Sequence, residues 1–173
     1  MEKERKLRYN INMELIQQLL VIKVSSIQVY LLWFLLGSFT VATLSDLKHM
    51  SAQKEFLQIW FLFVLAMFLT DLYYNYYLEQ NLAYLVIKWG LIFVFLPIYF
   101  HYIRHIAWGD ISAKMAACSL LPPIFILIFI VFIRIVDTLT RRLWQQWGKG
   151  RRYPFMPVIF FTTLILIVIS VLI

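Results

Sequence analysis

Long apolar segments alternate with short polar ones along most of this chain. Apolar runs extend over about 27–44, 56–74 and 82–100, a longer one covers 111–139, and a last one covers 155–173. A hydrocarbon core of about 30 Å takes roughly 20 helical residues at about 1.5 Å each. Because lipid satisfies no backbone polar groups, we expect these segments to cross a membrane as helices.

The segment 111–139 is too long for one upright span. Its 29 residues would form a helix of about 44 Å. Pro122 and Pro123 interrupt it, and adjacent prolines remove two backbone donors and push the preceding residue out of the helical region. We therefore predict a break near Leu121. The chain then forms an all-α polytopic membrane protein with about six transmembrane helices, including a short proline-broken helical hairpin.

The first 25 residues follow another pattern. Residues 1–10 are a mixed-charge tail, and residues 11–25 carry apolar side chains at helical spacing: Ile11, Leu15, Leu19 and Ile22. Apolar and polar faces on one helix are typical of a segment that lies in the membrane interface. We expect a tail and interfacial helix over 1–25, followed by a membrane domain over 26–173.

Composition agrees with the membrane class and excludes others. The chain is 62% hydrophobic and has a mean hydropathy of +0.79, which does not describe a soluble domain. Its formal charge of +7 is explained more simply by membrane topology and anionic lipid than by nucleic acid, which we do not expect as a partner. The single cysteine, Cys118, excludes a disulfide within the chain and a multi-cysteine zinc site.

Basic residues predict the orientation of the spans. With a hairpin at Pro122 and Pro123, nine of them fall on one side of the membrane, which the positive-inside rule makes cytoplasmic: Lys48, Lys54, Arg104, Lys114, Arg141, Arg142, Lys149, Arg151 and Arg152. Both termini then lie outside. Five basic residues that precede the first span oppose this orientation: Lys3, Arg5, Lys6, Arg8 and Lys23.

Asp46 and Asp110 are the candidate chemical groups. Each stands at the end of an apolar segment, where a carboxylate loses hydration and needs a partner or a function. Two spans separate them, and an even number of crossings returns a chain to the side that it left. Two carboxylates held together can share one proton and activate water. This pattern indicates an aspartyl hydrolase, while two helix-end carboxylates in interfacial water remain an alternative.

The other ionisable residues near the spans have simpler interpretations. We expect Asp71 and Asp137 to be solvated or paired with a basic group, and Lys88 to extend its ammonium outward to the interface. The spacing of the three histidines fits no metal-ligand pattern, so neither a metal nor a cofactor is predicted: His49, His101 and His105.

Three short motifs resemble those of the type IV prepilin peptidase family. Residues 44–49 (LSDLKH) resemble the first catalytic motif, in which an Asp at a helix end precedes Leu and a basic residue. Residues 107–110 (AWGD) are similar to the Gly-x-Gly-Asp motif that opens the next active-site helix. Residues 153–157 (YPFMP) resemble the Pro-Phe-x-Pro segment that opens the last helix. The three occur in order within about 27–173.

The resemblance implies an aspartic endopeptidase with Asp46 and Asp110 as its catalytic pair. One carboxylate, ionised, would take a proton from water while the other, protonated, polarises the scissile carbonyl; which is which stays open. Gly109 would let the substrate backbone approach. Lys48 would also bind the substrate, and it would contact lipid headgroups. The substrate would be the basic leader of a type IV pilin-like or archaellin precursor, cut at the cytoplasmic face of the cell membrane.

Several positions depart from the family pattern. Ala107 replaces the first Gly, residues 50–53 lack a usual proline, and Lys114 stands four residues after Asp110 where the family often places a Lys two residues after. The chain lacks the paired cysteines of the bifunctional bacterial enzymes, so it looks closer to the archaeal prepilin and preflagellin peptidases, and N-methylation is not expected.

Two other functions remain open at this point. A presenilin-like intramembrane protease shares the Gly-x-Gly-Asp signature, but that family places Tyr before its first Asp and Pro-Ala-Leu near its end. Here Ser45 precedes Asp46, and the late motif is Pro-Phe-Met-Pro. A catalytically silent membrane scaffold or assembly subunit is the other alternative.

Overall fold

The computed structural model describes seven parts of the chain: residues 13, 15–20, 24–49, 54–79, 82–103, 106–147 and 154–172. All regular structure within these parts is helical, with no strand, which confirms the predicted all-α class. The mixed-charge tail over 1–10 lies outside the described residues. Of the predicted interfacial helix, residues 13 and 15–20 are described, and 13 and 15–19 are helical.

Within the described residues from 26 onward, six helical segments follow one another. Some continue through π-helical turns, here labelled η. Their bounds are α2 Ser26–His49, α3 Lys54–Tyr73 with η1 Tyr74–Glu79, α4 Leu82–Gly90 with η2 Leu91–Phe95 and η3 Ile98–Ile103, α5 Trp108–Ser119, α6 Pro123–Trp147 and α7 Met156–Leu172.

Four segments within the described ranges are long and apolar enough to cross a membrane: Ser26–Lys48, Glu55–Tyr77, Leu82–Tyr102 and Pro123–Leu143. α7 is apolar but shorter, with 17 residues, and α5 has only 12. The helices therefore support a membrane protein with four candidate spans and two shorter helices packed among them.

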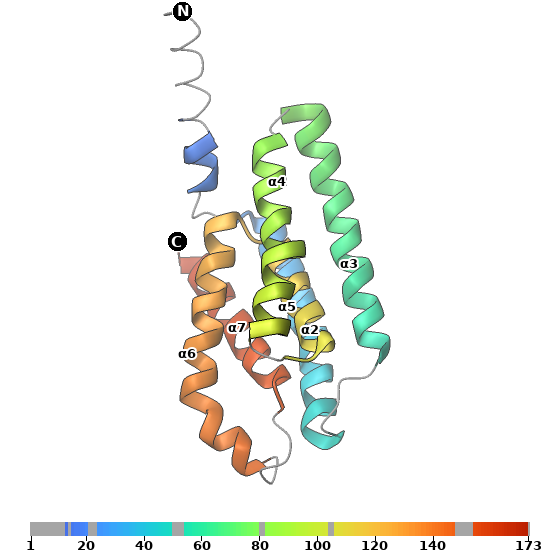
Figure 1. Cartoon of the computed structure of the whole chain (residues 1–173), viewed down its shortest axis with the longest axis vertical. Helices are drawn as coiled ribbons and strands as arrows, with labels where there is room; N and C mark the ends of the chain where they lie inside the picture. Colours follow the sequence, from blue (N-terminus) through green and yellow to red (C-terminus); the bar gives the residue numbers. More distant parts are fainter. Residues whose placement is uncertain are drawn as a thin grey trace, which may run out of the picture.

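The helices run alternately up and down, as Figure 1 shows. α2, η3 and α6 end at one end of the bundle, where α3, α5 and α7 begin. The predicted break near Leu121 is confirmed, because α5 ends at Ser119 and α6 begins at Pro123. Pro123 occupies the first helical position, where a missing N–H costs nothing.

α5 lies at the centre of the bundle (Figure 1). It packs against α2, α3, α6 and α7 and against the π-helical turns η2 and η3. Every residue from Ile111 to Ser119 is buried. Small side chains let backbones approach closely in membrane bundles, and α5 is rich in them: Ser112, Ala113, Ala116, Ala117 and Ser119.

α3 is held to α2 by an aromatic residue with a polar atom. Trp60 is fully buried, and its ring lies edge-on to Phe39, with 5.4 Å between centroids. The indole Nε1–H donates to the Ser38 Oγ at 3.1 Å. Trp60 therefore adds apolar contact area while its one donor is satisfied.

An ion pair joins α3 to α4. The Lys88 Nζ lies 2.6 Å from the Asp71 Oδ2, and the Trp89 Nε1–H donates to the same oxygen at 3.2 Å. Lys88 is only 3% exposed, so the prediction that it extends outward is wrong. The Asp71 carboxylate on the facing helix compensates the positive charge of Lys88. Ionised side chains inside a membrane domain commonly pair with one another in this way. The interpretation of Asp71 as a paired carboxylate is confirmed.

Replacing Lys88 by Met removes the counter-charge of Asp71. We expect Lys88→Met to lower the free energy of unfolding in detergent by about 3 kcal/mol, as for other buried pairs that lose one partner. The double variant Lys88→Met/Asp71→Asn should lose less, because no charge is left unpaired. Thermal unfolding measures both, with the exposed Lys48→Met as control. A Lys88→Met protein as stable as the parent would contradict the pair's role.

Candidate active site

Three segments far apart in the sequence meet at one end of the bundle. They are the end of α2, the start of α5 and the start of α7 (Figure 1). α2 packs against α5 and α7, and α5 packs against α7. Each segment carries one of the three motifs described above, so the fold brings all three motifs together.

Asp46 of α2 interacts with the start of α7. Its side chain is buried, with 6% exposed. The backbone N–H of Met156 donates to the Asp46 Oδ2 at 3.2 Å, and the backbone of Phe155 also hydrogen-bonds this carboxylate. The first amides of a helix lack partners within the helix, and a negative charge there is favourable. Asp46 therefore caps α7 from a neighbouring helix.

Asp110 lies in the first turn of α5. The N–H groups of Asp110 and Ile111 both donate to the Ala107 carbonyl, at 3.1 and 3.2 Å. The Asp110 carboxyl is half-buried and lies within electrostatic range of both Lys114 and Asp46. The structure thus brings the two aspartates predicted from the sequence into one site.

Lys114 completes this cluster from inside the bundle. It follows Asp110 by one helical turn and is fully buried. Its Nζ lies 4.0 Å from the ring centroid of Phe100 and 4.1 Å from that of Phe155. Aromatic faces attract a cation, most strongly where water is excluded. The site therefore combines two carboxyl groups with a positive charge that two aromatic rings surround.

Lys114 was predicted to lie among the basic residues outside the spans, and this prediction is wrong, because its side chain is fully buried. The signal for its real position was its spacing of four residues from Asp110, which puts both side chains on one face of a helix. Phe100 and Phe155 carried no signal of their own, because only the folded chain brings η3 and the start of α7 to Lys114.

Ala107, which stands where the Gly-x-Gly-Asp motif has its first glycine, shows no backbone strain. Its φ of −65° and ψ of 148° are extended values that any residue adopts. Gly109, in the first turn of α5, is half-buried, and its carbonyl accepts a hydrogen bond from the Ser112 Oγ at 2.8 Å. Glycine at position 107 is therefore not needed for the backbone to begin α5.

Lys48 does not share the position of the carboxyl pair. Its side chain is exposed, and residues two apart on a helix point in different directions. Its predicted contact with substrate therefore has no counterpart in the packing around Asp46 and Asp110.

His101 supports the start of α5. Its ring packs against that of Trp108 at a tilt of 34°, with 4.6 Å between centroids, and its Nδ1 lies 3.3 Å from the Ile106 carbonyl oxygen. The His49 side chain and His105 lie outside the described residues. Within the described part of the chain, no three His, Cys, Asp or Glu side chains are grouped so that they could hold a metal ion.

Comparisons with protein families, curated proteins and solved structures found no match to this chain. The interpretation of the site therefore depends on its residues and their geometry.

The capping role of Asp46 can be separated from its charge. Asp46→Ala removes the acceptor of the Met156 amide, and we expect it to lower the free energy of unfolding by about 1 kcal/mol. Asp46→Asn keeps one side-chain oxygen as acceptor and should retain most of that stability. Thermal unfolding in detergent measures the difference, and equal losses in the two variants would contradict the cap.

The charge of Lys114 should matter most when the carboxyl groups are ionised. We expect Lys114→Met to cost about 3 kcal/mol near pH 8, because it leaves two carboxylates inside the bundle without their counter-charge. Near pH 4, where carboxyl groups begin to take up protons, the loss should be smaller. Asp110→Asn in the Lys114→Met background should restore stability near pH 8. A loss of the same size at both pH values would contradict this electrostatic role.

Proposed function

We propose that this protein is a membrane-embedded aspartyl endopeptidase of the prepilin peptidase type. Its substrates would be type IV pilin-like or archaellin precursors, whose basic leaders it cuts. The single observation that carries the proposal is that Asp46 and Asp110, from different helices, lie within electrostatic range of each other. The position of the third motif, at the start of α7 beside Asp46, adds support.

The chemistry follows from the two carboxyl groups. Two negative charges within electrostatic range of each other disfavour the doubly ionised state, and this favours a pair that holds one proton. The ionised member takes a proton from the attacking water, and the protonated member donates a hydrogen bond to the scissile carbonyl. Lys114 offsets the remaining negative charge of the pair. This chemistry requires neither a metal nor a cofactor.

The backbone amides at the start of α7 hold Asp46 in a fixed position. An aspartic pair needs both carboxyl groups within reach of one water molecule, which a mobile side chain would not ensure. The hydrogen bond from Met156 restricts Asp46, and the first turn of α5 restricts the backbone of Asp110. In this proposal the Pro-Phe-x-Pro motif has a positioning role.

The proposed membrane arrangement counts six helices, with both termini outside and the aspartates at the cytoplasmic face of the cell membrane. α5 is about 18 Å long and α7 has 17 residues, so both are shorter than a full span. Other helices surround α5, and so its ends need not reach the bilayer surfaces. A substrate whose apolar helix stays in the bilayer would present its leader at the end of the bundle where the pair lies.

Cleavage of a synthetic precursor tests the proposal. The substrate is a peptide with a basic leader followed by an apolar helix of about 20 residues, mixed with the full-length protein in lipid nanodiscs. We expect cleavage by the parent protein and a loss of at least about a thousandfold in Asp46→Asn and in Asp110→Asn, because members of a catalytic unit fail together. Glu55→Gln, at an exposed acid of α3, should cleave normally.

Either Asn variant cleaving at the parent's rate would overturn the catalytic pair. A parent protein that remains folded but cleaves no basic-leader peptide over a pH series would favour the scaffold or assembly subunit. Cleavage within the apolar helix, in place of the leader junction, would favour the presenilin-like alternative.

A further inference from the structure

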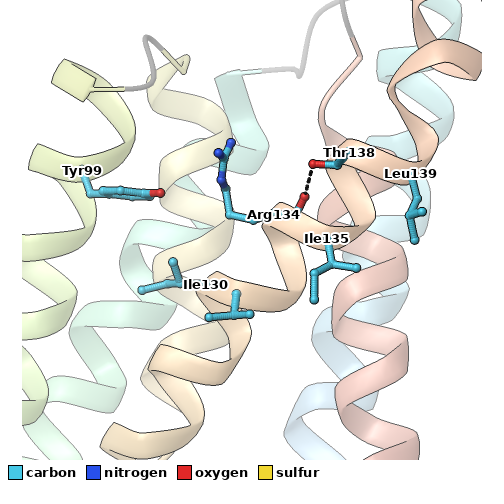
Figure 2. A pocket seen from close by; sticks show the side chains of 7 residues that line it. Tyr99, Ile130, Arg134, Ile135, Thr138 and Leu139 are labelled. Atoms are coloured by element: carbon cyan, nitrogen blue, oxygen red, sulfur yellow. Dashed lines mark hydrogen bonds between the residues drawn. The ribbon is translucent and has the colours of Figure 1, made fainter.

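A groove of about 430 Å³ lies on the surface of the bundle between η3 and α6. Tyr99 lines it on one side, and residues of the middle of α6 line it on the other. Figure 2 shows the Tyr99 and Arg134 side chains, from these two segments, extending into the space between the helices. The groove is separate from the cluster around Asp46 and Asp110, none of whose residues line it.

One part of the groove offers hydrogen-bond donors. The guanidinium of Arg134 carries five N–H groups, and the Tyr99 phenol adds an O–H. Thr138 also lines the groove, but its hydroxyl donates to the Arg134 backbone carbonyl at 2.8 Å (Figure 2). Arg134 and Tyr99 are therefore the side chains that can donate to a ligand.

The remaining lining is apolar, and most of it faces outward. Val131 is 57% exposed, Ile135 46% and Leu139 74%, and all three line the groove. In a membrane protein such side chains contact lipid chains. The groove thus combines one cationic group with an apolar surface that continues to the outside of the bundle.

Among the residues that the structure describes, no acidic one lines the groove. Asp137, the nearest acid along α6, is buried, and the described residues contain no ion-pair partner of Arg134. A nearby anion stabilises an arginine at membrane depth. A guanidinium matches the oxygens of a phosphate well, because its donors form a planar fork.

We propose that this groove binds one anionic phospholipid. The headgroup phosphate accepts hydrogen bonds from Arg134 and Tyr99, and the glycerol and acyl carbons of the lipid contact Val131, Ile135 and Leu139. Arg141 follows Arg134 by two helical turns on the same face of α6 and is exposed, so it adds positive potential toward the headgroup.

The charge of the groove distinguishes this ligand from the alternatives. A basic leader peptide would be repelled by Arg134 and Arg141, so the groove is a poor site for the proposed substrate. A free phosphate would use the donors and leave the apolar lining without a function. Only a lipid satisfies both parts of the groove, and this inference does not depend on the proposed peptidase activity.

Lipid titration of the full-length protein in neutral detergent tests the site. Native mass spectrometry and thermal unfolding follow the addition of phosphatidylglycerol, phosphatidylcholine, glycerol phosphate or inorganic phosphate. We expect saturable binding and stabilisation by phosphatidylglycerol, with an affinity at least tenfold higher than for phosphatidylcholine. Glycerol phosphate and inorganic phosphate should have little effect, because they lack acyl chains.

Variants locate the binding in the groove. Arg134→Met keeps an apolar stem and should weaken phosphatidylglycerol binding at least tenfold, Tyr99→Phe should weaken it severalfold, and Arg134→Lys should fall between Arg134→Met and the parent. Arg142→Met removes an exposed arginine of α6 that does not line the groove, and it should bind within twofold of the parent. If Arg134→Met does not fold, Arg134→Lys and Tyr99→Phe carry the test.

Three results would overturn the proposal. The first is unchanged phosphatidylglycerol binding in the Arg134 and Tyr99 variants. The second is equal stabilisation by the two phospholipids, which would mean that the headgroup charge is not recognised. The third is equal stabilisation by inorganic phosphate, which would make the groove a site for a soluble anion.

Discussion

The whole bundle depends on burying α5 on every side. A helix in that position must let its neighbours approach closely, and the small residues from Ser112 to Ser119 meet this requirement. It must also compensate any charge that it carries, and the rings of Phe100 and Phe155 lie against the ammonium of Lys114. Since those rings come from η3 and the start of α7, compensation of one buried charge also determines where two other segments lie.

The end of α2 and the start of α7 are joined by the same kind of requirement. The unpaired amides of α7 need an acceptor, and Asp46 supplies it from another helix. A carboxylate that is already held by backbone amides has few orientations left, so it is well suited to meet a second carboxyl group in a defined way. The Asp46 side chain thus accepts a hydrogen bond from a free amide at the start of α7, and the same contact holds its carboxyl group in position.

Much of the fold could be predicted from local rules, whereas the environments of single charges could not. The apolar runs and Pro122–Pro123 located the helices and the break, since span length and proline geometry act within a segment. The count of crossings placed Asp46 and Asp110 at one end. Lys88 and Lys114 were misplaced because their burial depends on which residues face them, Asp71 and Phe155 among them. Likewise, the sequence carried no sign that the Met156 amide would meet Asp46.

The pair between Lys88 and Asp71 also bears on how the chain enters the membrane. Each residue alone places an ionised group in an apolar helix, which opposes transfer of that helix into lipid. Facing each other across α3 and α4, the two groups cancel in net charge, and the Trp89 indole shares the same carboxylate oxygen. The hairpin of α3 and α4 is consequently a better unit for insertion than either of its helices alone. This contact of the folded protein therefore favours insertion of α3 and α4 together.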